Sequence, residues 1–175
     1  MKKFRFLLLD ANIIFKLHEL GIWGQVLDRC ELLVARTIVE QEVKYFRGAT
    51  HDSLIDLGPD IAAKRIEVVD VDAVRMKAFL DQFDPVYFGE MDPGEAESLA
   101  YLIDSNDPCV ICSSDAIVYR VLGCLGLVEQ GISLETILQK VGLGRSLTYQ
   151  FTERFREYWT GRGQQDGMRG IGVKK

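Results

Sequence analysis

The chain of 175 residues is long enough for one domain with a hydrophobic core, and its 47% apolar and 27% charged residues are typical of a globular protein. No apolar run approaches the roughly 20 residues of a membrane span, and no segment has the long apolar region of a signal peptide, so we expect a cytoplasmic protein without membrane contact. The net charge of −5 comes from an acidic excess in residues 1–139, which argues against broad nonspecific binding to nucleic acid. Residues 140–175 are basic, which suits either a phosphate contact or a solvated helix face with a loose tail.

Four short segments are almost continuously apolar and bounded by polar residues. Such segments are typical of parallel strands that are covered on both faces. The predicted strands are residues 4–9, 32–35, 66–71 and 108–112.

Helical patterns lie between and after these strands. The predicted helices are residues 36–46, 71–83, 93–104, 113–126 and 133–142. Strands that alternate with helices predict a layered α/β fold with a parallel sheet.

The C-terminal part predicts a further helix. Phe151, Phe155, Tyr158 and Trp159 share one helical face in residues 146–160, which we interpret as a face docked on the core rather than a partner surface. Residues 161–175 hold five glycines and no apolar cluster, so we predict a flexible tail. The predicted domain therefore covers residues 1–145, followed by an aromatic helix and the tail.

The cysteines and histidines give no metal-binding pattern. Cys109 and Cys112 form a C-x-x-C sequence, but it lies in a predicted strand, where residues three apart point to opposite faces. We therefore expect buried, reduced thiols rather than a redox or zinc pair. Neither His18 nor His51 has metal-ligand spacing with a cysteine.

Carboxylates follow the strands instead. Asp10 comes directly after the first strand, and Asp115 comes three residues after the fourth. Glu95 lies in the first turn of the helix opened by "DPGE", and Glu42 lies early in the helix after the second strand. In an open α/β sheet ligands bind beyond the carboxyl ends of the strands, so four separate segments can bring acids to one edge.

Four acids without matched basic groups would repel one another and could not all ionise. Mg²⁺ and Mn²⁺ prefer carboxylate and water oxygens, and one or two such ions would neutralise the cluster. This arrangement suggests metal-dependent hydrolysis of phosphodiesters. A single Asp after a strand is also common as a turn or helix-cap residue, and that interpretation stays open for each acid taken alone.

The motifs that carry these acids resemble those of the PIN-domain nucleases. The family pattern begins with an apolar strand that ends in D-x-N or D-x-S, here "LLLDANIIF", and continues with a V-x-x-E-[LV] helix, here "TIVEQEV", which matches Glu42 better than Glu40. Next comes a G-E-x-E helix start, here "DPGEAESLAYL", and then a strand followed by [T/S]-x-D, here "ICSSDAIVYRVLGCLGL". "GISLETILQKVGL" resembles the segment that follows in many members, so the resemblance covers roughly residues 4–142.

The resemblance implies a three-layer α/β/α sandwich around the central parallel sheet, a Mg²⁺ or Mn²⁺ site and ribonuclease activity. The acidic site would consist of Asp10, Glu42, Glu95 and Asp115, with the metal on Asp10, Glu95 and Asp115. Asn12, Ser113 and Glu97 would support it, and Asp92 is a further candidate. Ser114 stands where many relatives carry a second acid beside Asp115, which would leave one strong ion.

Many small members of this family are toxins that are held by an antitoxin. The partners implied are therefore an RNA substrate and an antitoxin protein, and a homodimer is a further candidate assembly. The aromatic helix and the tail lie outside the minimal family pattern.

Two other functions compete with the nuclease hypothesis. A phosphatase of the haloacid dehalogenase type would use Asp10 as nucleophile, but that family has D-x-D where this chain has Asn12. A covalent phosphoenzyme would distinguish it from direct attack by water. A non-catalytic module that binds nucleic acid or protein on the same fold is the third hypothesis, and metal binding without RNA cleavage would favour it.

Overall fold

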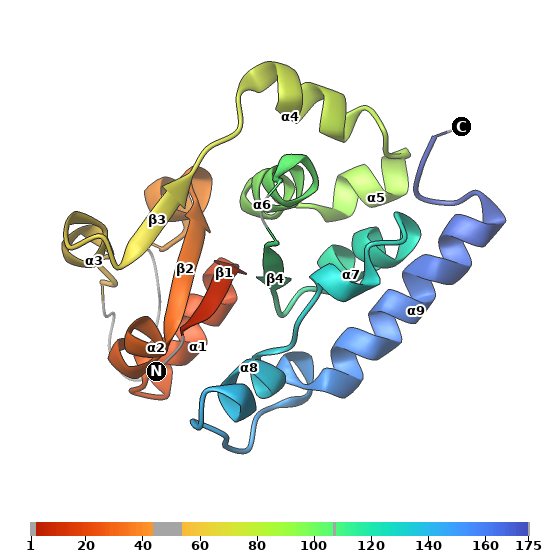
Figure 1. The fold of residues 1–175 in the computed structure, drawn as a ribbon. Helices are drawn as coiled ribbons and strands as arrows, with labels where there is room; N and C mark the ends of the chain where they lie inside the picture. Colours follow the sequence, from red (N-terminus) through yellow and green to blue (C-terminus); the bar gives the residue numbers. More distant parts are fainter. Residues whose placement is uncertain (1–2, 44–53, 107, 175) are drawn as a thin grey trace.

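A four-stranded parallel sheet forms the centre of the protein, as the sequence predicts (Figure 1). The computed structural model describes residues 3–43, 54–106 and 108–174. The strands are β1 (Phe4–Leu9), β2 (Cys30–Ala35), β3 (Ile66–Val69) and β4 (Val110–Cys112), in the spatial order β3-β2-β1-β4. In the register, Leu9 is opposite Cys112, so the carboxyl ends of β1 and β4 lie side by side.

Helical segments connect the strands and pack around the sheet. Helix α6 contacts both β2 and β4, α2 contacts β2, and α3 contacts β3. The segments are α1 (Ala11–Glu19), α2 (Trp23–Arg29), the π-helix η1 (Ile38–Glu42), α3 (Gly58–Ala62), α4 (Ala73–Leu80), α5 (Pro85–Glu90), α6 (Pro93–Asp104), α7 (Ala116–Cys124), the 3₁₀ helix η3 (Val128–Gln130), α8 (Leu134–Lys140), the 3₁₀ helix η4 (Tyr149–Phe151) and α9 (Glu153–Arg169).

Several helices were predicted and others were not. Helix α6 has the predicted bounds, because Pro93 stands in its first turn and a capping box closes its amino end. Helices α1, α2, α3 and α5 were not predicted; they are short, and α1 follows β1 without a loop. Of the predicted helix 36–46, the structure contains the π-helix η1, and residues 44–46 lie outside the described residues, as does His51.

The C-terminal prediction was wrong in its bounds. The helix was expected over residues 146–160 with a flexible tail behind it, but α9 begins at Glu153 and continues to Arg169. Thr152 is its N-cap residue, and Gly170, with φ +72°, ends it. Phe151 and Phe155 are buried, as the docking interpretation predicts, whereas Tyr158 is 53% exposed.

The glycines that suggested flexibility are contact residues between two helices. Helices α7 and α9 lie side by side (Figure 1). A Cβ atom at Gly163 would overlap the backbone of Arg120, and one at Gly123 would overlap the backbone of Thr160. These glycines therefore allow a close approach of the two helix backbones, which outweighs their low helix propensity.

The sequence predicts buried thiols at the two cysteines of the C-x-x-C sequence. Cys109 and Cys112 are both buried, in agreement with the predicted buried thiols. His18 is half-buried and stacks on Trp23, with ring centroids 4.9 Å apart. Across the described helices, none has the length and apolarity needed to cross a membrane.

Candidate metal centre

Asp10 connects the end of β1 to the start of α1. Its backbone N–H donates to the carbonyl of Cys112 on the neighbouring strand, at 3.2 Å. The residue is the N-cap of α1, but its side chain makes no capping hydrogen bond. Instead, the carboxylate accepts a hydrogen bond from Ser113 Oγ, at 3.0 Å, and is 4% exposed. The carboxylate is therefore directed across the carboxyl edge of the sheet rather than toward its own helix.

Asp115 is held opposite Asp10 by two polar side chains that the sequence predicts as supporting residues. Its backbone N–H donates to Ser113 Oγ at 3.0 Å, so this one hydroxyl contacts both acidic residues. Asn12 Nδ2 donates to Asp115 Oδ2 at 3.1 Å. Asp115 is the N-cap of α7 and, like Asp10, makes no side-chain capping bond.

The buried Tyr119 fixes the loop that carries Ser113 and Asp115. Its hydroxyl lies 2.8 Å from the carbonyl of Ser113 and 2.9 Å from that of Ile132, and it accepts the backbone N–H of Ser113 at 3.2 Å. Sequence reasoning did not identify this residue. The available signal was a tyrosine four positions after Asp115, one helical turn away, in a mostly apolar helix.

Glu95 enters the site from the first turn of α6. Its backbone N–H donates to Asp92 Oδ1 at 2.8 Å, and its Oε2 accepts the backbone N–H of Asp92 at 3.0 Å, which forms a capping box. The side chain of Glu95 is 4% exposed. Asp92 thus supports Glu95 through the cap of the helix.

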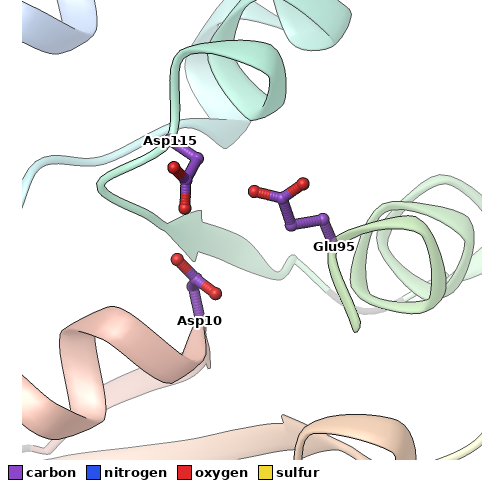
Figure 2. Close-up of side chains that lie close together, drawn as sticks. All are labelled: Asp10, Glu95 and Asp115. Carbon is purple, nitrogen blue, oxygen red and sulfur yellow. The ribbon is translucent and has the colours of Figure 1, made fainter. Parts of the chain in front are cut away.

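The three acids converge in space. One carboxylate oxygen from each of Asp10, Glu95 and Asp115 lies within 4.8 Å of the other two (Figure 2). Figure 2 shows the three side chains pointing toward one another from β1, from α6 and from the loop after β4. Among the described residues, no Lys or Arg forms an ion pair with any of them. Within the part of the chain that the structure describes, hydrogen-bond donors contact the cluster, but no cationic side chain neutralises its charge.

Burial and mutual repulsion raise the pKa values of these groups. Burial, followed by the charge of Asp115, raises the pKa of Asp10 to about 7, although the bond from Ser113 opposes the shift. Burial raises the pKa of Glu95 to about 9, with further repulsion from Asp92, Asp115 and Asp10. Without a cation, part of the cluster is therefore protonated at neutral pH.

Glu42 lies beside the three acids but outside their group. It is half-buried on η1, and its Oε1 accepts the backbone N–H of Gly94 at 3.1 Å. Burial, followed by the charges of Asp92 and Asp115, raises its pKa to about 7. A Cβ atom at position 94 would overlap Glu42 and Ile38, so a glycine is required where η1 meets α6. Glu42 is therefore close enough for the charges of Asp92 and Asp115 to raise its pKa, but it is not one of the three acids whose carboxylate oxygens converge.

Glu97 is buried but points to a different part of the fold. Its Oε2 accepts the backbone N–H of Thr37, at 2.8 Å, and its Oε1 accepts that of Val71, at 3.3 Å. These two residues follow β2 and β3. Glu97 therefore stabilises the loops that follow two neighbouring strands. The structure does not bring it into the group of three acids.

The donor set fits a hard divalent cation. The cluster offers three carboxylates from three segments, two of them buried, and no thiolate or imidazole. Such oxygen-only sets suit Mg²⁺, Mn²⁺ or Ca²⁺ rather than Zn²⁺. A cation there would remove the repulsion that raises the pKa values, so this acidic cluster could hold a metal ion.

Comparison with known proteins adds no relative: no protein-family model, no curated protein and no solved structure matches this chain. The resemblance to the PIN-domain nucleases therefore stays a prediction from the sequence motifs.

Proposed function

We propose that this protein is a metal-dependent nuclease that hydrolyses RNA phosphodiester bonds, on a three-layer fold like that of the PIN-domain nucleases. The observation that supports this proposal best is the convergence of Asp10, Glu95 and Asp115 at the carboxyl edge of a parallel sheet, with no cationic side chain paired to them among the described residues. A buried acidic cluster without a cationic partner destabilises the metal-free protein. A bound cation would remove this destabilisation, which supports a functional metal site.

Each residue has a role in this mechanism. Asp10, Glu95 and Asp115 would hold Mg²⁺ or Mn²⁺, which when bound supplies charge neutralisation at the phosphate and a more acidic water. Ser113 and Asn12 orient two of the carboxylates through the hydrogen bonds described above. Asp92 orients Glu95, and Glu42 is placed to take up a proton because its pKa lies near 7.

The test is cleavage of a mixed pool of single-stranded and structured RNAs by the purified protein, with Mn²⁺ and with EDTA. Asp115→Asn preserves shape and removes one negative charge, so we expect at least a hundredfold loss of cleavage at saturating Mn²⁺, about 3 kcal/mol or more of transition-state stabilisation. Asp104→Asn is the matched control, because Asp104 is exposed at the far end of α6. It should retain wild-type cleavage.

Three results would contradict the proposal. Full activity of Asp115→Asn, or cleavage that persists in EDTA, would exclude this metal-dependent mechanism. Release of phosphate from phosphomonoesters without any cleavage of RNA would favour the phosphatase hypothesis, in which Asp10 is the nucleophile.

A further inference from the structure

A pocket of about 570 Å³ opens directly beside the metal centre. Three segments form it: one face of α1, the start of α7 and the chain that leads into α9. The lining residues are Asn12, Phe15, Lys16, Glu19, Ser114, Asp115, Thr148, Gln150 and Phe151. Its volume lies within the range of roughly 300–1,000 Å³ that is usual for small-molecule sites.

The pocket and the metal centre share a wall. Asp115 belongs to the acidic cluster and also lines the pocket, and the Asn12 side chain that donates to it lines the pocket as well. A ligand that contacts the metal centre through one group can therefore extend a neighbouring group into this pocket without leaving the surface of the protein.

The lining has the chemistry that a nucleoside requires. Phe15 and Phe151 supply aromatic surface, and the exposed Thr148 and Gln150 supply hydrogen-bonding groups. Lys16 supplies a positive charge at the wall; its Nζ lies 2.9 Å from Glu19 Oε1 and 5.6 Å from the centroid of the Phe151 ring. Aromatic rings stack on bases of any sequence, and a carboxamide can distinguish the edges of different bases.

We propose that this pocket binds the unpaired base of the nucleotide next to the scissile phosphate, with Phe15 as the stacking surface and Gln150 as the group that sets base preference. The inference rests on the proposed nuclease function and specifies its substrate class as single-stranded RNA. A base in a duplex is stacked and paired on both sides, so it cannot enter a pocket whose walls contact its face and its edge.

The first experiment measures the pocket without any cleavage. The metal-free protein is titrated with AMP, CMP, GMP and UMP, and with ribose 5-phosphate as the ligand that lacks a base, while NMR signals of the pocket residues are followed. We expect at least one nucleotide to shift the signals of Gln150, Lys16 and Thr148, and ribose 5-phosphate to leave them unchanged. Phe15→Leu keeps an apolar side chain and removes the aromatic face, so it should weaken nucleotide binding about tenfold. Phe15→Tyr should restore it.

The second experiment maps the cut sites of the wild type and of Gln150→Ala on a randomised single-stranded RNA. We expect the wild type to prefer one base beside the cut, and Gln150→Ala to reduce that preference about tenfold. Gln165→Ala is the matched control, because Gln165 is exposed on α9 and does not line the pocket. It should cut with the wild-type preference.

The outcomes separate the two proposals. RNA cleavage with identical cut-site preference in the wild type and Gln150→Ala, or nucleotide binding that is unchanged in Phe15→Leu, would overturn the pocket assignment and leave the nuclease function standing. Nucleotide binding that depends on Phe15 in a protein that cleaves no RNA would overturn the nuclease function and leave the pocket as a nucleotide site. Absence of nucleotide binding at millimolar concentration would overturn the pocket assignment.

Discussion

Asp10 and Asp166 are both buried carboxylates, with 4% and 5% of their surface exposed, but their surroundings are opposite. Asp166, on α9, accepts hydrogen bonds from Arg120 Nη2 and from the Tyr87 hydroxyl, both at 2.9 Å. Arg120 also pairs with Glu90, at 2.9 Å, and lies over the Tyr87 ring. We refer to these four residues as the α5–α7–α9 network. Asp10 instead faces Glu95 and Asp115, and its carboxylate accepts a hydrogen bond from the Ser113 hydroxyl.

The pKa values differ in direction for the same reason. Burial alone would raise the pKa of Asp166, but the bonds from Arg120 and Tyr87 outweigh it, so that pKa is lowered. Burial and Asp115 together raise the pKa of Asp10. The contrast separates a buried acid that the fold itself neutralises from a group of acids that could hold a metal ion.

The largest expected effect comes from breaking the compensated region. Arg120→Met removes the cation and leaves Asp166 buried beside a tyrosine hydroxyl, so we expect a loss of about 4 kcal/mol in the free energy of unfolding, measured with urea. Arg154→Met is the control, because Arg154 is exposed on the same helix as Asp166. An unchanged free energy of unfolding in Arg120→Met would mean that the network contributes nothing to stability.

The stability of the metal-free protein should fall as the pH rises, because the pKa values in the acidic cluster are raised. The pKa values of about 7 for Asp10 and Glu42 and about 9 for Glu95 lie above the ordinary values of 3.8 and 4.5, so the folded protein binds more protons than the unfolded chain. Stability in EDTA should therefore fall by several kcal/mol as the pH rises from about 5, just above the ordinary values, to about 9. The lowered pKa of Asp166 acts oppositely, and its contribution is lost as the pH falls toward that value. Unfolding curves at constant ionic strength measure this, and a rise in stability over this interval would contradict it.

Removing one charge from the uncompensated region should stabilise the metal-free protein. Asp10→Asn retains an oxygen that can accept the Ser113 hydrogen bond, and it removes the repulsion with Asp115, so we expect a gain of about 2 kcal/mol at about pH 8 in EDTA. Its sign is opposite to that of Arg120→Met. Destabilisation of Asp10→Asn in EDTA would mean that the ionised Asp10 is compensated after all.

The cation itself provides the next test. At a millimolar Mn²⁺ concentration about ten times the dissociation constant, Mn²⁺ should stabilise the wild type by about 1.4 kcal/mol. This gain should raise the Tm by about 4 °C. Arg120→Met should show the same increase, because its defect lies outside the acidic cluster, and Asp10→Asn should show little. Thermal melts of the three proteins with and without Mn²⁺ measure the differences. The absence of a shift in the wild type would argue strongly against a metal centre.

The sequence predicted the acidic edge better than it predicted the helix contacts. Strand ends and helix starts are local signals, and in a parallel sheet they determine which edge Asp10, Glu95 and Asp115 occupy. The role of Gly163 is not local, because it depends on the approach of α7, more than 35 residues away in the chain. From the sequence alone, the glycines of α9 therefore suggest a flexible tail, because the sequence does not show that α7 packs against them. The same limit explains why Tyr119 was missed, since its hydroxyl acts on backbone groups that only the fold brings near.

The smallest effect concerns Glu97, a third buried carboxylate, which is compensated by backbone groups. Each of its oxygens accepts one N–H, from Thr37 and from Val71, and glutamine can replace only one of these acceptors. We therefore expect Glu97→Gln to destabilise the protein by about 1 kcal/mol, in EDTA and in Mn²⁺ alike. Glu95→Gln, the same substitution two residues earlier, should instead stabilise the protein in EDTA and lose the response to Mn²⁺, because the pKa of Glu95 is raised to about 9 by burial and by its acidic neighbours. Urea unfolding of both variants under both conditions measures the contrast. Loss of the Mn²⁺ response in both variants would show that Glu97 acts together with Glu95, and a full response in both would contradict the metal-binding role proposed for Glu95.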